Sequence, residues 1–168
     1  MSSLKLPVTL ISLMCGICLY AIAAPDQQIH IQADNMRFDI NSGDSIYQGN
    51  VRFVQGNIDL SGDRVNVKSK DGKIINVQVT GSPARYHDST ESGRVLAESE
   101  QMDYAVTENK LTMRGTARLE QDARVVQSQQ IIYDTEKKLI LAGKSPGKKG
   151  GETDRVNITL TPKKDRTP

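Results

Sequence analysis

The 168-residue sequence has no tryptophan and only two histidines and two cysteines. Both cysteines, Cys15 and Cys18, lie in the apolar segment at the N-terminus, so the chain after that segment has no cysteine. Their position excludes disulfide bonds, thiolate metal sites and a cysteine nucleophile from the folded part of the protein. Aromatic residues make up only 4% of the sequence, which leaves mid-sized aliphatic side chains to form most of a core.

The residues that most often carry catalysis are scarce. His30 is expected on the polar side of a strand and His87 in a loop beside Asp88, where a histidine is usually an ordinary surface residue. A Gly-x-Ser-x-Gly match at residues 143–147 lies in a linker-like segment without the helix that a nucleophile elbow requires. Phosphate-loop, dinucleotide and zinc-helix motifs are absent, and the aspartates are not spaced as a calcium loop. We therefore expect a binding or structural protein, not an enzyme, with no catalytic residues, metal or cofactor.

Residues 1–23 have the features of a cleaved signal peptide. Lys5 supplies the positive charge, residues 6–20 are mostly apolar, and Ala21-Ile22-Ala23 matches the small-residue cleavage pattern. Cleavage after Ala23 is favoured over cleavage after Ala24. An uncleaved membrane anchor is the alternative, but the apolar run is shorter than the roughly 20 residues that span a bilayer. The segment predicts export and a mature chain with one domain.

The charge balance gives no indication of a nucleic-acid partner. The 22 basic and 20 acidic residues leave a formal net charge of +2. Only residues 143–168 are clearly basic, and the glycine, proline and lysine content of residues 143–151 is typical of a flexible linker. This C-terminal segment is either simply solvated or attracted to an anionic lipid surface. A short amphipathic run at residues 156–160 predicts one more strand within it.

From residue 28 onward, apolar and polar residues alternate as they do in strands with one buried face. Ile29 and Ile31, for example, alternate with His30 and Gln32. The dipeptide Asp71-Gly72 is a strong signal for a short hairpin. No long window has helical periodicity, so the pattern predicts an all-β protein of many short antiparallel strands. Further turns are expected at residues 41–44, 56–57, 61–63 and 108–109, and late strands at residues 130–133 and 138–142.

Two stretches of the chain, 66 residues apart, are similar without gaps. Residues 34–38 and 49–55 align with residues 100–104 and 115–121, with identities that include Met36 with Met102 and Gly49 with Gly115. The alternative is chance similarity between amphipathic strands. A true repeat would stack its copies to bury one continuous apolar surface, with Val51 and Ala117 at corresponding inward positions.

Because one face of each strand is polar, the apolar faces must pack against one another. The predicted fold is an antiparallel β jelly roll of two packed, twisted sheets, with a closed barrel as the competitor. The mid-sized inward side chains are compatible with an open apolar groove between the sheets. Composition alone does not show that such a groove stays open, and without further evidence a tightly packed interior is the favoured expectation.

Several segments occur in an order and spacing that resemble the LptA/OstA-like family of periplasmic lipopolysaccharide-export proteins. They are residues 26–34, 47–51, 55–58, 81–86 and 101–104. The resemblance covers essentially all of residues 26–142. It implies a signal peptide at 1–23, an OstA-like β jelly-roll domain at 24–142 and a separate basic segment at 143–168, which matches the family poorly.

What the resemblance implies is a periplasmic bridge. Such proteins shelter the lipid A acyl chains of lipopolysaccharide in an open apolar groove and stack head to tail by self-association. The groove then runs from the inner-membrane transporter complex to the outer-membrane translocon. Burial of each methylene contributes about 0.8 kcal/mol, so acyl chains can bind without polar contacts. A non-enzymatic periplasmic β scaffold with a packed interior is the alternative.

On matching positions, the resemblance implies that Ile29, Ile31, Tyr86, Tyr104 and Val106 line the groove. Arg85-Tyr86 stands where the family often has two apolar residues. Combined with the alternation of the strands, the expected lipid-binding set is Ile29, Ile31, Met36, Phe38, Tyr47, Val51, Phe53, Ile58, Leu60, Val77, Val79, Tyr86, Met102, Tyr104, Val106, Leu111, Met113 and Leu119.

Overall fold

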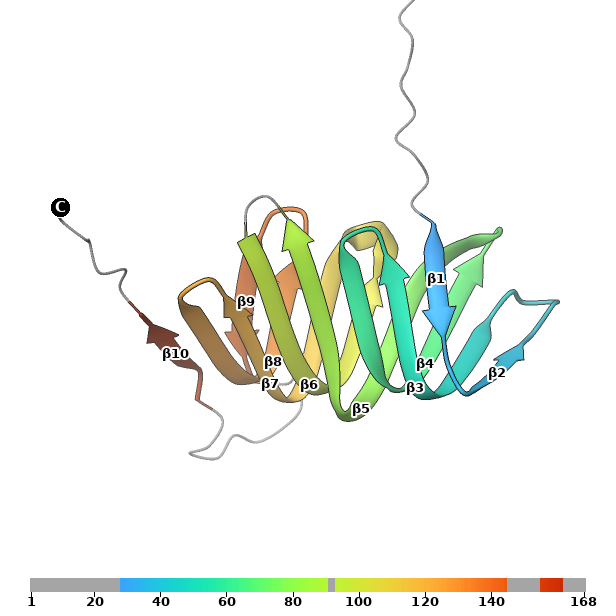
Figure 1. Ribbon diagram of the computed structural model, residues 1–168. Coiled ribbons are helices and arrows are strands. Elements are labelled where there is room, and N and C mark those ends of the chain that lie inside the picture. The colour runs from blue at the N-terminus through green and yellow to red at the C-terminus, as the bar shows by residue number, and fades with distance from the viewer. Residues whose placement is uncertain (1–27, 91–92, 145–154, 162–168) are drawn as a thin grey trace, which may run out of the picture.

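The computed structural model describes residues 28–90, 93–144 and 155–161 (Figure 1). The expected signal peptide and most of the expected linker lie outside these residues. The described chain is almost entirely β-strand, with one short 3-10 helix, as expected from the period-two pattern. The elements are β1 (Ile29–Gln32), β2 (Asn35–Phe38), β3 (Ser45–Gln55), β4 (Ile58–Lys70), β5 (Lys73–Thr90), β6 (Gly93–Ala105), η1 (Val106–Glu108), β7 (Lys110–Gln121), β8 (Arg124–Asp134), β9 (Leu139–Gly143) and β10 (Asn157–Leu160).

The strands form one antiparallel sheet in the order β1-β3-β4-β5-β6-β7-β8-β10, with β2 paired to β3 and β9 paired to β8. Figure 1 shows the long strands curving through the base of the molecule, so that this sheet folds into a trough. The two layers of the predicted jelly roll are therefore two halves of the same strands. The prediction of many short strands was wrong for the central ones, since β5 alone has 18 residues.

Each side of the trough has its own edge strands, and we name the sides by them. The β1–β10 arm contains β1, β10 and residues 51–55, 58–61, 84–90, 93–99, 117–121 and 124–128. The β2–β9 arm contains β2, β9 and residues 45–48, 64–70, 73–80, 101–105, 110–114 and 130–134. β1 and β2 lie at one end of the trough, and β9 and β10 lie at the other (Figure 1).

The bend between the arms coincides with a row of register shifts. They occur between Gln48 and Val51 in β3, and at neighbouring positions in β4, β5, β6 and β7. Bulges of this kind bend and twist a strand, which allows one strand to serve both layers. The turn predicted at residues 61–63 was wrong for this reason, because Gly62 lies at the bend inside β4. A Cβ at Gly62 would approach the Thr80 carbonyl oxygen to 2.7 Å, so only glycine fits there.

The same bend geometry occurs at both positions that the sequence repeat aligns. Gly49 has φ +79° and Gly115 has φ +74°, and the residue after each also has positive φ. In each copy the side chain of that next residue donates a hydrogen bond to the acidic residue of its own copy, Asp34 at 2.9 Å or Glu100 at 3.4 Å. The two copies therefore share a local structure and not only a sequence pattern.

Replacing Gly49 by alanine is expected to destabilise the protein more than replacing Gly72. Both glycines have φ between +74° and +79°, where an L-residue costs about 1–2 kcal/mol. At Gly49 the new Cβ would in addition collide with the Asp34 carboxylate, whereas nothing lies within 4 Å at Gly72. Urea denaturation of Gly49→Ala and Gly72→Ala measures the difference. Equal losses would show that the carboxylate contact has no effect on stability.

A single apolar cluster fills the lower part of the trough between the arms. Its largest fully buried side chains include Tyr86, Tyr133, Phe53, Met102 and Leu111. They come from alternate positions of successive strands, so one face of the folded sheet supplies the whole core. The interior side chains are indeed mostly mid-sized aliphatic ones, as the composition predicts.

Local differences from the sequence predictions have simple causes. Val106 belongs to the 3-10 helix η1 and not to a strand. A register shift between Lys68 and Ser69 breaks the strict alternation of β4 and β5 and brings Ile74 against the core. His87 lies within β5 and not in a loop. The expected hairpin at Asp71-Gly72 is confirmed, since both residues have positive φ and Lys70 pairs with Lys73.

Candidate functional site

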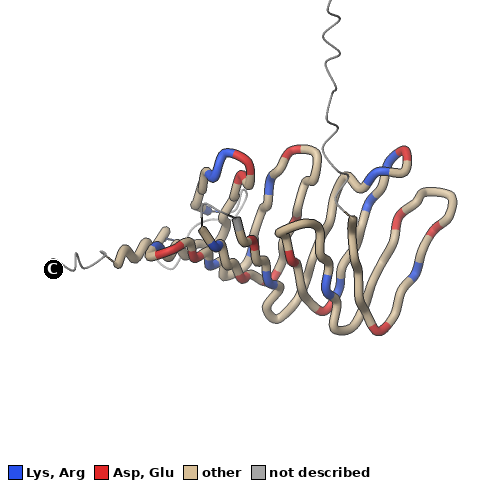
Figure 2. The backbone as a smooth tube through the Cα atoms, turned by 45° about the horizontal axis from the view of Figure 1, so that its top comes forward, with Lys and Arg blue, Asp and Glu red and all other residues tan. Residues whose placement is uncertain are grey.

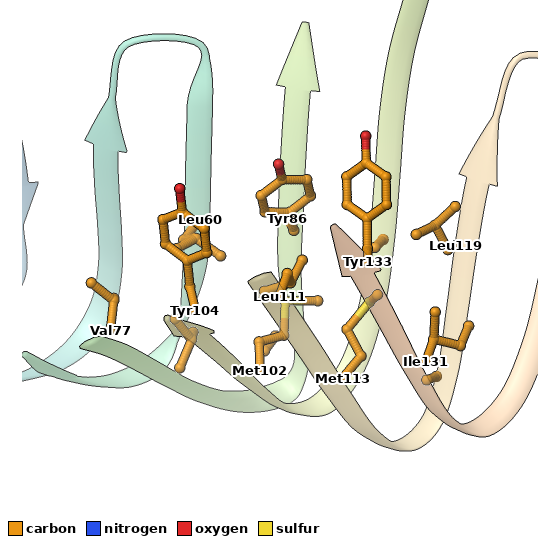
Figure 3. Packing of buried hydrophobic residues seen from close by; sticks show 14 of the residues in the cluster. Leu60, Val77, Tyr86, Met102, Tyr104, Leu111, Met113, Leu119, Ile131 and Tyr133 are labelled. Carbon is orange, nitrogen blue, oxygen red and sulfur yellow. The ribbon is translucent and has the colours of Figure 1, made fainter. Parts of the chain in front are cut away.

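The inner face of the trough is the candidate site, because it gathers the apolar side chains of every long strand. Figure 3 shows Met102, Met113 and Ile131 low in the trough, and Tyr86, Tyr104 and Tyr133 above them with their hydroxyls toward the opening between the arms. We call that opening the mouth. The low residues have no exposed surface. The lower trough is thus filled by the protein's own side chains, and open space must lie at the mouth or the ends.

The expected lipid-binding residues fall into three groups on this inner face. Eleven are buried in the cluster, five are partly buried against it, and Met36 and Phe38 are 62% and 51% exposed. Val51 and Ala117 point inward as expected, but each is only 1% exposed and faces packed core. The partly buried group is Ile29, Ile31, Tyr47, Ile58 and Val106, and the buried group is Val51, Phe53, Leu60, Val77, Val79, Tyr86, Met102, Tyr104, Leu111, Met113 and Leu119.

Two clefts open from the trough. The mouth cleft, of about 360 Å³, lies between the arms and includes Ile58, Asp88, Tyr104 and Val106 in its lining. The end cleft, of about 370 Å³, lies beside the last strands and is lined mainly by apolar residues. They are Leu119, Val126, Ile140, Ala142, Val156 and Ile158, together with Gln121, Arg124 and Lys138. A larger cleft of about 670 Å³ is lined mostly by polar residues around the bend and lacks this apolar character.

Both ends of the trough expose apolar side chains of its inner face. At the first end, Met36 of β2 pairs with the inward Tyr47 and yet is 62% exposed. At the other end, Ile158 of β10 pairs with the inward Val126 and is also 62% exposed. Directly opposed residues of a strand pair lie on the same face. The inner apolar surface therefore continues to both edges of the described sheet, and no described residue caps it there.

A cluster of polar groups lies where the two arms meet near the mouth. The rings of Tyr86 and Tyr133, from opposite arms, meet edge to face with centroids 6.4 Å apart. Lys138 Nζ lies 3.4 Å from the Asp88 carboxylate and 5.9 Å from the centroid of the Tyr133 ring. Asp88 is only 4% exposed, although it carries a charge. We call these four residues the mouth cluster.

The hydroxyls of the two cluster tyrosines and of the neighbouring Tyr104 remain protonated at physiological pH. Burial raises the pKa of Tyr86, Tyr104 and Tyr133, and the negative charge of Asp88 raises all three pKa values further. The pKa of Tyr133 rises to about 12. The phenols therefore act as hydrogen-bond donors. The buried hydroxyl of Tyr133 nevertheless has no hydrogen-bond partner among the described residues, and that of Tyr86 makes only a weak contact with the Asp88 carboxylate.

Tyr133, Asp88 and Lys138 are not among the residues expected at the site. The inward position of Tyr133 could have been predicted, because Tyr133 lies two residues after Ile131 in a strand expected from the sequence. Asp88 shares the inward face of β5 with Tyr86, but an aspartate on that face is normally read as a sign of exposure. Its partner Lys138 is 50 residues away, which local pattern reading does not connect.

The outer faces of the sheet are polar and of mixed charge. Figure 2 shows basic and acidic positions interspersed along the chain. Arg85 points outward and pairs with Glu98 at 3.2 Å, so only Tyr86 of the Arg85-Tyr86 pair enters the trough. Among residues 28–90, 93–144 and 155–161, no cluster of histidine and acidic residues is arranged to hold a metal ion. Nor does this part of the chain contain a helix of the length and apolarity needed to cross a membrane.

Comparison with known proteins identifies the family to which this trough-shaped protein belongs. The family described as LptA/(LptD N-terminal domain) LPS transport protein matches residues 30–139. The chain belongs to this family. Among its relatives, the lipopolysaccharide export system protein LptH of Pseudomonas aeruginosa is 29% identical over 151 residues, which cover 86% of each chain. The lipopolysaccharide export system protein LptA of Escherichia coli is 27% identical over 165 residues, which cover 95% of this chain and 85% of the relative.

The fold agrees with this membership. The crystal structure of Pseudomonas aeruginosa LptH, described as the LptA-homologous periplasmic component of the conserved lipopolysaccharide transport device, superimposes with a TM-score of 0.74 at 28% identity. The match covers 81% of this chain and 96% of that structure. The family resemblance and the jelly-roll class expected from the sequence are therefore both confirmed.

Proposed function

We propose that this LptA-family protein is a non-enzymatic periplasmic bridge that carries lipopolysaccharide from an inner-membrane transporter complex to an outer-membrane translocon. The observation that carries the proposal is the apolar inner face of the trough, which no described residue caps at either end. Membership of the lipopolysaccharide transport family supports it. The lipid A acyl chains would lie between the arms, with the polar part of the ligand at the mouth.

The physical basis of binding is apolar burial. Each methylene transferred from water into the trough contributes about 0.8 kcal/mol, so several acyl chains bind strongly without a specific polar contact. Because the lower trough is packed, we infer that chains enter at the mouth and end clefts and that the arms separate to admit more of them. The bend at the bulges is the natural place for such a movement. The proposed bridge consumes no energy, so directed transport requires a motor elsewhere.

The two uncapped ends support head-to-tail self-association as a further part of this proposal. β1 and β2 end the sheet on one side, and β9 and β10 end it on the other. An edge strand carries backbone donors and acceptors that a strand of a second molecule can pair with. Met36 and Phe38 of one copy would then lie near Ile158 and Leu160 of the next, which buries apolar surface that is exposed in the single chain.

The alternative function is a periplasmic β scaffold without a ligand. The packed lower trough favours it, since side chains such as Met102 and Leu111 have no exposed surface. The clefts and the uncapped ends favour the bridge. Purified mature protein that neither retains nor captures lipopolysaccharide would support the scaffold.

A photo-crosslinking residue at Tyr104 or Ile31 is expected to label bound lipopolysaccharide, whereas one at His30 or Asp103 is not. Tyr104 and Ile31 contact the inner apolar cluster. His30 is exposed on the other face of β1, and Asp103 accepts a hydrogen bond from Asn76 at 2.7 Å away from the core. The two pairs come from the same strands and serve as matched controls. Equal labelling at all four positions would contradict a ligand confined to the trough.

A further inference from the structure

We propose that the mouth cluster (Tyr86, Tyr133, Asp88 and Lys138) is a hydrogen-bonding subsite for a hydroxyl group carried on an acyl chain. This inference rests on the proposed function, because it assumes that acyl chains occupy the trough. It adds a means of selecting among them. Apolar burial alone treats all chains of equal length alike, whereas a polar subsite inside an apolar trough does not.

The cluster lies on the path between the two clefts. Asp88 lines the mouth cleft and Lys138 lines the end cleft, and the ion pair between them joins the two arms. The contacting rings of Tyr86 and Tyr133 also join the arms. An acyl chain that extends from one cleft to the other must therefore displace or pass these groups. A polar atom on that chain would come into contact with them.

Two buried hydroxyls of the cluster lack a good hydrogen-bond partner among the described residues. The Tyr133 hydroxyl makes no hydrogen bond to any of them, and the Tyr86 hydroxyl makes only a weak contact with the Asp88 carboxylate. A buried donor without a partner is costly, and natural cores rarely keep two so close together. Both hydroxyls point toward the mouth in Figure 3, which is the direction from which a ligand would enter. A ligand atom that accepts hydrogen bonds would therefore be stabilised beside these two hydroxyls.

The carboxylate of Asp88, by contrast, needs a hydrogen-bond donor. It is a buried acceptor, and the contact with Lys138 occupies only part of its hydrogen-bonding capacity, since an ionised carboxylate has about four acceptor positions. A ligand atom that accepts from phenols and donates to a carboxylate satisfies both needs. A hydroxyl oxygen does this with one atom, because it has two lone pairs and one proton. An ester carbonyl offers acceptors only.

The test compares two soluble single-chain probes, the decanoyl and the 3-hydroxydecanoyl amides of glucosamine. They share head group, chain length and amide linkage and differ only by one hydroxyl. Titration into delipidated mature protein is expected to show about tenfold tighter binding of the hydroxylated probe, which is the effect of one or two net hydrogen bonds. Tyr86→Phe and Tyr133→Phe should each remove most of this preference. Tyr47→Phe removes a phenol elsewhere on the inner face and should retain it.

Each result has a definite meaning. The phenylalanine variants should keep the wild-type melting temperature, because among the described residues the Tyr133 hydroxyl has no partner and the Tyr86 hydroxyl has only a weak contact with Asp88. Equal binding of the two probes by the wild type would overturn the subsite and leave the proposed function intact. A preference retained in both Tyr86→Phe and Tyr133→Phe would overturn it as well. If neither probe nor lipopolysaccharide binds, the proposed function fails together with the inference that rests on it.

Discussion

Phenylalanine at Ala142 is expected to reduce lipopolysaccharide binding at least tenfold while the fold keeps its stability. Ala142 lies on the inner side of β9, is only partly buried, and lines the end cleft of about 370 Å³. A phenyl ring placed there enters the open space of the cleft. It therefore excludes the ligand without pushing neighbouring side chains out of position. The loss of binding follows because an acyl chain that no longer fills the cleft forfeits about 0.8 kcal/mol for each methylene.

The same substitution at Ala117 is the matched control, and we expect it to destabilise the fold. Ala117 is 1% exposed and faces the packed lower trough next to the bend in β7. Overpacking a closed core typically costs about 1–3 kcal/mol. Val51→Phe, at the corresponding position of the other repeat copy, should behave like Ala117→Phe because it is equally buried.

Thermal denaturation measures the change in stability, and a lipopolysaccharide-binding assay on the same samples measures the change in binding. Retained stability in Ala117→Phe and Val51→Phe would show that the lower trough is not packed. A loss of several degrees in Ala142→Phe would show that the end cleft is not open space. If Ala142→Phe keeps both stability and full binding, the acyl chains do not use that cleft, and the mouth cleft becomes the entry site.

The face of each strand was predictable from sequence because strand side chains alternate strictly. Met102 and Tyr104 lie on one side of β6 and Asp103 on the other, as their polarity indicates. The repeat was informative for the same reason: Gly49 and Gly115 recur where the strands must bend. Local polarity and local repetition are properties of short segments, so a single sequence contains them.

The way in which the strands continue from one arm to the other was not predictable in this manner. Ser61-Gly62-Asp63 has the composition of a turn, and a bulge uses the same residue types. What makes it a bulge is the continued pairing of β4 with β5 on both sides of Gly62. The buried Asp88 is a similar case, because its partner Lys138 is 50 residues away in the sequence. Such features depend on long-range contacts.

Glutamate at either uncapped end of the trough is expected to abolish self-association without affecting the fold. Met36 and Ile158 are each 62% exposed, so a charge at either position costs the single chain little. In a head-to-tail assembly each would be buried against the next copy, where an unpaired charge is strongly unfavourable. Light scattering over a concentration series is expected to show larger species for the wild type and monomers for Met36→Glu and Ile158→Glu. Thr159→Glu, on the other face of β10, should still associate.

A mixture of the two variants shows whether the assembly is head to tail. Met36→Glu retains an intact β9–β10 end, and Ile158→Glu retains an intact β1–β2 end. In a head-to-tail arrangement these two intact ends form one junction, and the charged ends prevent a second. The mixture should therefore form dimers with one copy of each variant and nothing larger. If self-association instead joins two identical ends, the variant that keeps that end intact would dimerise alone, and mixing would add no new species.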